Sequence, residues 1–324
     1  MLHTFMEGEV NLNSAIVSKK SKSKARVKNK KKKFSREAMW AYLFIAPTFL
    51  GLAVFYMFPA VASFVLSFTR WDGMTAPVFV GLENVITLFQ DSSFIRAIIN
   101  TVIFTAISVP LSAGIATCIA VMLNQKIKGM VFYRTLYFLP VVTMPVAVGM
   151  VWKWLYNTDY GLINYVLGIF NLPQPSWLFD PNIALISVIV VYVWMTVGNN
   201  VILILAGLQG VSKSYYEAAQ IDGASKLRQF FSITLPLITP TLFFVFITGM
   251  ISSLQVFDLI FIMIGDSTAL LEPLRTVVYA VYEYGFEYSQ MGMASAQAFI
   301  LFLAILAITI IQFVFQKKWV HYDG

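Results

Sequence analysis

Six long apolar segments separate the polar stretches of this 324-residue chain. Each lacks Asp, Glu, Lys and Arg, and together they cover residues 38–69, 97–125, 135–152, 181–212, 229–257 and 288–316. A helix that crosses a membrane needs about 20 mostly apolar residues. Strands of a membrane barrel would instead alternate over about 10 residues. The pattern therefore predicts an all-α polytopic membrane protein with six transmembrane helices.

The composition excludes several other classes of protein. Hydrophobic residues make up 58% and charged residues 12%, against about 45–50% and about 25% in soluble domains. So few charges could not cover the surface of a water-soluble enzyme of this size. The single cysteine, Cys118, excludes an internal disulfide and is interpreted as a small packing residue. The only histidines, His3 and His321, lie at the termini, so no metal site is predicted inside the apolar body.

The basic residues predict the orientation in the membrane. Eleven of the 23 Lys and Arg residues lie within residues 19–36. With the N-terminus inside, the connections on the inner side hold eight of the others and the outer side holds four. Both termini are therefore expected in the cytoplasm, at the plasma membrane. Residues 1–37 are interpreted as a basic, disordered tail that contacts anionic lipid and not nucleic acid. Residues 38–318 form the predicted transmembrane domain, and residues 319–324 form a C-terminal tail.

The segment 209–235, between the fourth and fifth apolar runs, predicts a short helix, a turn and a second helical piece. Ser214 and Glu217 have the spacing of a capping box at a helix start. Gly223 can take the positive φ that ends a helix. Pro236 can begin the next span. Three residues of the short helix share one face: Tyr216, Ala219 and Gln220.

This segment resembles the signature of permease subunits of bacterial ABC importers, which reads E-A-A, three residues, G, nine residues, I-x-L-P. The chain has Glu217-Ala218-Ala219, then Gly223, then Ile233 and Leu235-Pro236, with every spacing matched. The resemblance implies the type I importer permease fold with a cytoplasmic coupling helix. The residues expected to couple this helix to an ATPase subunit are Glu217, Ala218, Ala219, Asp222 and Gly223.

Further segments resemble carbohydrate-uptake permeases of the maltose and glycerol-3-phosphate type, and the likeness runs from about residue 41 to residue 316. They are 134–140, 152–156, 161–164, 198–200 with Trp194, 205–209, 255–260 and 291–296. The chain departs from this type at residues 265–267, where Gly-Gly-Pro is usual, and at Ser212, near which a proline is usual.

The resemblance implies a set of partners. They are a second homologous permease, two ATPase subunits, an extracytoplasmic solute-binding protein and a carbohydrate substrate, with an oligosaccharide expected. The chain has no G-x-x-x-x-G-K-[ST] phosphate-binding loop. No cofactor and no catalytic residue are therefore expected on it, and ATP and Mg are expected on the ATPase partners.

Polar side chains inside the spans predict the substrate pathway, because such groups are costly in lipid and usually face a wet cavity. Amides and carboxylates suit the hydroxyl groups of a sugar, and aromatic rings suit its apolar faces. Trp194, Asn199, Asn200, Gln255 and Asp258 are the candidates. The alternative is that these groups only form hydrogen bonds between helices.

Other interpretations stay open at this stage. Pro140 and Pro145 predict a kink in the third span, which is either static or a hinge. An ion- or proton-driven secondary transporter is the competing function, but Asp258 is the only charge deep in a span. An integral-membrane enzyme would need a cluster of catalytic side chains that the sequence does not contain.

Overall fold

The computed structural model describes residues 36–125, 129–265 and 267–320, and the chain divides into two compact units after Pro59. The first unit contains helix α2 (Arg36–Leu52), the π-helix η1 (Ala53–Met57) and the start of α3 (Phe58–Leu66). Together these elements give one apolar helix over Met39–Leu66. Of the predicted basic tail, only residues 36 and 37 fall within the described residues, and they begin α2.

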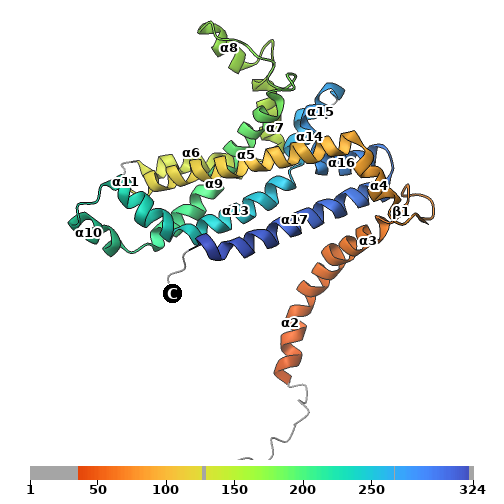
Figure 1. Cartoon of the computed structure of the whole chain (residues 1–324), viewed down its shortest axis with the longest axis horizontal. Helices are drawn as coiled ribbons and strands as arrows, with labels where there is room; N and C mark the ends of the chain where they lie inside the picture. Colours follow the sequence, from red (N-terminus) through yellow and green to blue (C-terminus); the bar gives the residue numbers. More distant parts are fainter. Residues whose placement is uncertain (1–35, 126–128, 266, 321–324) are drawn as a thin grey trace, which may run out of the picture. The chain divides into compact units, whose positions relative to one another are not determined.

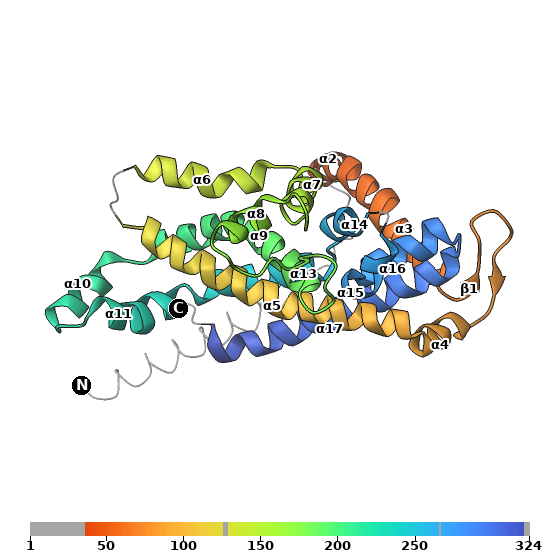
Figure 2. The same ribbon diagram turned by 90° about the horizontal axis from the view of Figure 1, so that it is seen from above.

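The second unit is built on four long helices, which lie side by side in Figures 1 and 2. They are α5 (Ser92–Leu123), α9 (Ala184–Gly210), α13 (Thr239–Leu254) and α17 (Met291–Trp319). Helix α5 packs along α9, and α13 contacts α5, α9 and α17. The residues buried between them are mostly Ala, Val, Ile and Leu, with a few hydroxyl and amide side chains.

Within the described residues, five helical stretches are long and apolar enough to cross a membrane: Met39–Leu66, Ser92–Leu123, Ala184–Gly210, Thr239–Ile264, which is interrupted at residues 255–257, and Met291–Trp319. The third predicted span is divided into α6 (Met130–Val142) and α7 (Pro145–Leu155), of 13 and 11 residues. Proline disfavours the α conformation in the residue before it, and Met144 is extended with ψ 132°. The expected kink is thus a complete break in the helix.

A second break follows α13. Residues 255–257 are not helical, and the short helix α14 (Asp258–Ile264) continues the chain beyond them. Helix α14 packs closely against α7, where Gly149 leaves room for Ile262. The Lys153 ammonium group donates a hydrogen bond of 3.1 Å to the Ile262 carbonyl oxygen. The segments that follow the two breaks therefore pack against each other.

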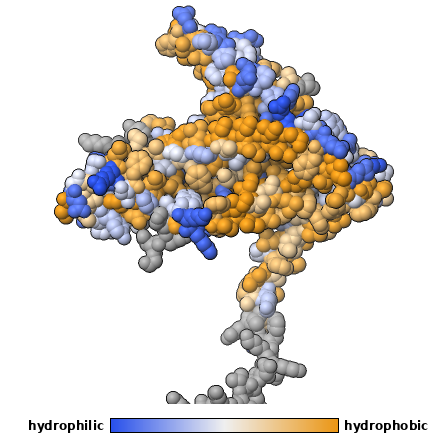
Figure 3. Space-filling view, viewed as in Figure 1, coloured by the Kyte–Doolittle hydropathy of each residue, from blue (hydrophilic) through white to orange (hydrophobic). Residues whose placement is uncertain are grey.

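Short elements connect these helices. They are β1 (Thr69–Arg70), β2 (Val78–Phe79), α4 (Glu83–Gln90), α8 (Leu162–Ile169), η3 (Thr268–Leu270), α15 (Leu271–Leu274), α16 (Val277–Tyr282) and η4 (Glu283–Glu287). Strands β1 and β2 pair antiparallel, with Thr69 opposite Phe79. Figure 3 shows hydrophobic side chains gathered over the long helices, with hydrophilic ones at the ends of the elements. This distribution fits helices that cross a lipid bilayer.

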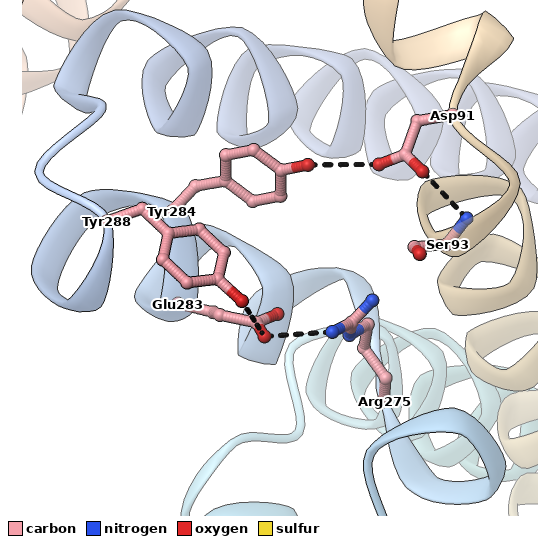
Figure 4. A network of polar contacts seen from close by, with 6 residues as sticks. All are labelled: Asp91, Ser93, Arg275, Glu283, Tyr284 and Tyr288. Atoms are coloured by element: carbon pink, nitrogen blue, oxygen red, sulfur yellow. Dashed lines mark hydrogen bonds and ion pairs between the residues drawn. The ribbon is translucent and has the colours of Figure 1, made fainter. Parts of the chain in front are cut away.

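An ion pair is buried where α15, α16 and η4 meet (Figure 4). Arg275 donates to Glu283 Oε1 at 2.8 Å, and the side chains are 14% and 1% exposed. The Tyr288 hydroxyl also donates to Glu283 Oε1, at 2.9 Å. Beside this pair, the Tyr284 hydroxyl donates to Asp91. Burial and then that hydrogen bond raise the pKa of Tyr284 to about 12, so its phenol remains a donor at neutral pH.

The close contact between α6 and α9 depends on Gly198. A Cβ at this position would overlap the backbone oxygen of Tyr137, whereas a Cβ at Gly114, on α5, would meet nothing within 4 Å. Gly198→Ala should therefore lower the free energy of unfolding by about 1–3 kcal/mol. Gly114→Ala, the matched control, should be neutral or stabilise by up to about 1 kcal/mol. Thermal unfolding in detergent measures both, and equal melting temperatures would contradict the close contact.

Removing one member of the buried ion pair leaves the other charge without its partner. Glu283→Gln should destabilise the protein by about 3–5 kcal/mol. The double variant Arg275→Met with Glu283→Leu should recover most of this loss, because neither charge is then buried. Denaturation followed by tryptophan fluorescence tests the pair, and a double variant no more stable than Glu283→Gln would contradict it.

Candidate functional site

A cavity of about 280 Å³ lies between α5, α9, α13 and the break that separates α6 from α7. Its polar lining residues are Ser108, Ser112, Thr143, Tyr192, Thr196, Asn199, Asn200, Thr248 and Ser252. The rest of the lining is Val109, Pro140, Val141, Pro145, Met195, Val245 and Gly249. Among these residues none carries a charge. The cavity thus offers hydroxyl and amide groups beside apolar surface, which is the chemistry that suits an uncharged polyhydroxylated ligand.

A hydrogen-bond network joins α5 to α9 along the cavity wall. Asn200 Nδ2 donates to Ser112 Oγ at 2.9 Å, and Ser112 Oγ lies 3.0 Å from Thr196 Oγ1. Thr196 Oγ1 also donates to the carbonyl oxygen of Tyr192 at 2.9 Å. Ser108 Oγ is buried and has no hydrogen-bond partner among the described residues. These hydrogen bonds hold the wall in place, and Ser108 is the buried hydroxyl of the lining that they leave unpaired.

The structure brings only some of the predicted pathway residues to this cavity. Asn199 and Asn200 line it, and Trp194, Gln255 and Asp258 do not. The Trp194 ring packs against Trp152 of α7, with the centroids 5.7 Å apart. Gln255 is the C-cap of α13 and Asp258 begins α14, so both lie at the second break and both are exposed.

Sequence reasoning missed most of the hydroxyl groups in the cavity. Ser108 and Ser112 lie four residues apart on α5, and Thr248 and Ser252 have the same spacing on α13. Residues at this spacing share a helix face. Two such pairs in apolar spans could therefore have indicated a polar face on each helix. A serine or threonine in a membrane helix can, however, donate to its own backbone, which makes the signal weak for any single position.

The segment with the importer signature forms a separate candidate site. Helix α10 (Lys213–Ile221) carries Glu217, Ala218 and Ala219, and Asp222 is its C-cap. Its N-cap is Ser212, whose hydroxyl accepts from the Ser214 N–H, so the predicted cap at Ser214 is wrong by two residues. Gly223 has φ +74°, as its place after a helix predicts. Ala224 N–H closes the turn on the carbonyl oxygen of Ala219 at 2.9 Å.

Helix α10 exposes most of its surface. Within it, only Tyr216 and Ala219 are half-buried, while Gln220 is exposed. The predicted shared face is therefore confirmed for two of its three residues. After the turn follow α11 (Lys226–Gln229), the π-helix η2 (Phe230–Thr234) and α12 (Leu235–Leu237), which leads into α13. Pro236 lies in α12, so the next long helix begins three residues later than expected, at Thr239.

Residues 92–321 match the family model of the binding-protein-dependent transport system inner membrane component. The chain belongs to this family. The match covers the cavity and the whole of α10 to α12, so both candidate sites lie within the family's own domain.

Curated relatives span almost the whole chain. The probable ABC transporter permease protein YesP of Bacillus subtilis is 36% identical over 300 residues, which cover 91% of this chain and 96% of the relative. The sn-glycerol-3-phosphate transport system permease protein UgpA of Agrobacterium fabrum is 34% identical, over 87% of this chain and 96% of the relative. These relatives are transport permeases, so this chain is a membrane transport component and not an enzyme.

Solved structures share the fold. The crystal structure of a bacterial ABC transporter involved in the import of the acidic polysaccharide alginate matches with a TM-score of 0.79 and 22% identity. The match covers 87% of this chain and 96% of the other. The predicted fold, an all-α permease of an ABC importer, is thereby confirmed. Among the residues described here, no group of His, Cys, Asp and Glu is placed to hold a metal ion.

Proposed function

We propose that this permease forms one half of the pore of an ATP-driven carbohydrate importer. The observation that carries the proposal is the cavity lined by hydroxyl and amide groups midway along α5 and α9. Polar groups in a membrane bundle are costly and usually mark a solute pathway. A second homologous permease completes the pore, and an extracytoplasmic solute-binding protein delivers the sugar. The relatives named for glycerol-3-phosphate and alginate support a carbohydrate as the transported class.

The charge of the cavity supports a neutral sugar. Glycerol phosphate and alginate are anions, and a site for an anion ordinarily provides arginine, lysine or several N–H donors. The described lining residues provide none of the cations. Arg275 is half-buried outside this lining, and its charge is already paired with Glu283. We therefore assign the substrate to the uncharged carbohydrates, with an oligosaccharide as the expected form.

The energy for transport comes from ATP hydrolysis on partner subunits. Two ATPase subunits bind ATP and Mg, and α10 inserts into a groove on one of them through Glu217, Ala218, Ala219, Asp222 and Gly223. The exposure of Glu217 and Ala218 supports this role. Closure of the ATPase pair then shifts the equilibrium of the permease between its inward-open and outward-open states. The shift can be no larger than the difference between the free energies with which the closed ATPase pair binds these two states. With α10 in the cytoplasm, both termini lie there too, and the protein spans the bacterial inner membrane.

If the cavity binds the sugar, changes to its lining should alter the KM for uptake. Asn200→Ala removes a group that lines the cavity and should raise the KM for uptake about fivefold, the effect of one lost hydrogen bond. Gln255→Ala should leave KM unchanged, because Gln255 lies outside the lining. Uptake of a labelled neutral oligosaccharide by cells that express the whole system measures both. The reverse order of effects would place the substrate at the second break.

If the turn after α10 couples ATP hydrolysis to transport, changes to its backbone should separate the two activities. Proline cannot adopt the φ of +74° found at Gly223, so Gly223→Pro should insert in the membrane yet lose most sugar uptake while the complex still hydrolyses ATP. Gly223→Asn should retain much of the uptake, because asparagine tolerates the left-handed region. Uptake and ATP hydrolysis are measured on the same reconstituted complex. Normal uptake by Gly223→Pro would contradict the coupling role.

A further inference from the structure

The coupling helix is tied to the base of the next span by a chain of side-chain hydrogen bonds. The Tyr216 hydroxyl of α10 lies 3.0 Å from Thr234 Oγ1, across 18 positions of sequence. Thr234 Oγ1 also donates to the carbonyl oxygen of Gln229 at 3.4 Å. Gln229 Nε2 in turn donates to the carbonyl oxygen of Ala224, in the turn, at 2.9 Å. These hydrogen bonds thus connect helix α10, the turn that follows it and the π-helix η2 at the start of the next span.

The inner members of this chain are buried. Thr234 is 6% exposed and Gln229 is 9% exposed, whereas α10 is exposed along most of its length. A hydrogen bond shielded from water resists competition better than one on an open surface. The Tyr216 hydroxyl therefore attaches a mostly exposed helix to a packed structure through its side chain.

Without this attachment, the backbone would be the principal mechanical link. It passes through Gly223, whose glycine backbone is the most permissive in the segment, and then through α11. A push on α10 could then be absorbed by rotation at the turn. With the bond in place, α10, the turn and η2 move together.

The geometry points to Tyr216 as a positioning residue that transmits movement of α10 to the cavity. This inference rests on the proposed function, since it assumes that an ATPase partner moves α10. Thr234 ends η2 and is followed directly by α12 and then α13. Helix α13 carries Thr248 and Ser252 to the cavity wall. The path from the coupling helix to the cavity therefore runs through one hydrogen bond and two consecutive helices, α12 and α13.

A cysteine reporter in the cavity tests this without knowledge of the sugar. The reporter chain carries Cys118→Ala, which removes the native thiol, and Val141→Cys at the cavity lining. The complex with the second permease and the ATPase subunits is reconstituted in lipid. The probe is a small maleimide, and the measured quantity is the ratio of labelling rates with and without ATP and vanadate.

The key variant is Tyr216→Phe, which removes only the hydroxyl, and the matched control is Tyr215→Phe on the same helix. We expect Tyr216→Phe to keep ATP hydrolysis and assembly but to reduce the nucleotide-dependent change in labelling about two- to tenfold, the effect of one hydrogen bond. Tyr215→Phe should keep the full change. Thr234→Val should behave as Tyr216→Phe does, and Thr234→Ser, which keeps a hydroxyl, should restore the response.

The outcomes separate this inference from the proposed function. If the reporter chain with no further change shows no response to nucleotide, or does not assemble with an ATPase, the proposed function fails. If that chain responds and Tyr216→Phe responds equally, the function stands and the inference about Tyr216 is wrong. A Thr234→Ser chain that responds as weakly as Thr234→Val would likewise overturn it, because loss of packing and not of the hydroxyl would then be the cause.

Discussion

The close packing of α5 against α9 is the contact on which the rest of this bundle depends. Lipid is as apolar as leucine, so helices in a membrane associate through close packing and hydrogen bonds and not by exclusion of water. The buried residues Ala113, Ala116 and Ala120 of α5 belong to the same core cluster as Val197 and Val201 of α9. Their small size lets the backbones approach, and the Asn200–Ser112 hydrogen bond forms at the same interface. The cavity opens where this row of small residues gives way to hydroxyl groups.

The two helix breaks, between α6 and α7 and between α13 and α14, both lie at or next to the cavity. Irregular backbone at membrane depth leaves N–H and C=O groups without helical partners, and it is tolerated where protein or a water-filled cavity surrounds it. The first break places Thr143 and Pro145 on the cavity. The second comes three residues after Ser252, which also lines it. The helices beyond the breaks, α7 and α14, are held together by the Lys153–Ile262 hydrogen bond. The first break thus forms part of the cavity wall, and the second lies next to it along the chain.

The sequence predicts the long helices well and the facing of side chains poorly, for physical reasons. Charge-free runs locate α5, α9, α13 and α17, because lipid imposes the same apolar requirement at every position of a span. The direction in which Trp194 points depends on the rotation of α9, which packing against α5 and α6 sets, and no local pattern encodes that. Arg275 is one of the four basic residues predicted on the outer side, yet its side chain is only 14% exposed because it pairs with Glu283, eight residues later. Gly223 was predictable because its conformation is a local property.

One helix connects the two candidate sites, and this limits how a transport cycle could work. From Thr239 to Thr248 and Ser252, α13 rises about 14–20 Å at 1.5 Å per residue. An α-helix of that length bends little, so displacement at its base reaches the cavity wall with small loss. The helix ends at Leu254, two residues past Ser252 of the cavity lining, and α14 packs against α7 instead. Under the proposed function, a push on α10 would therefore move the α13 side of the cavity relative to the α7–α14 pair, with the non-helical residues 255–257 between them.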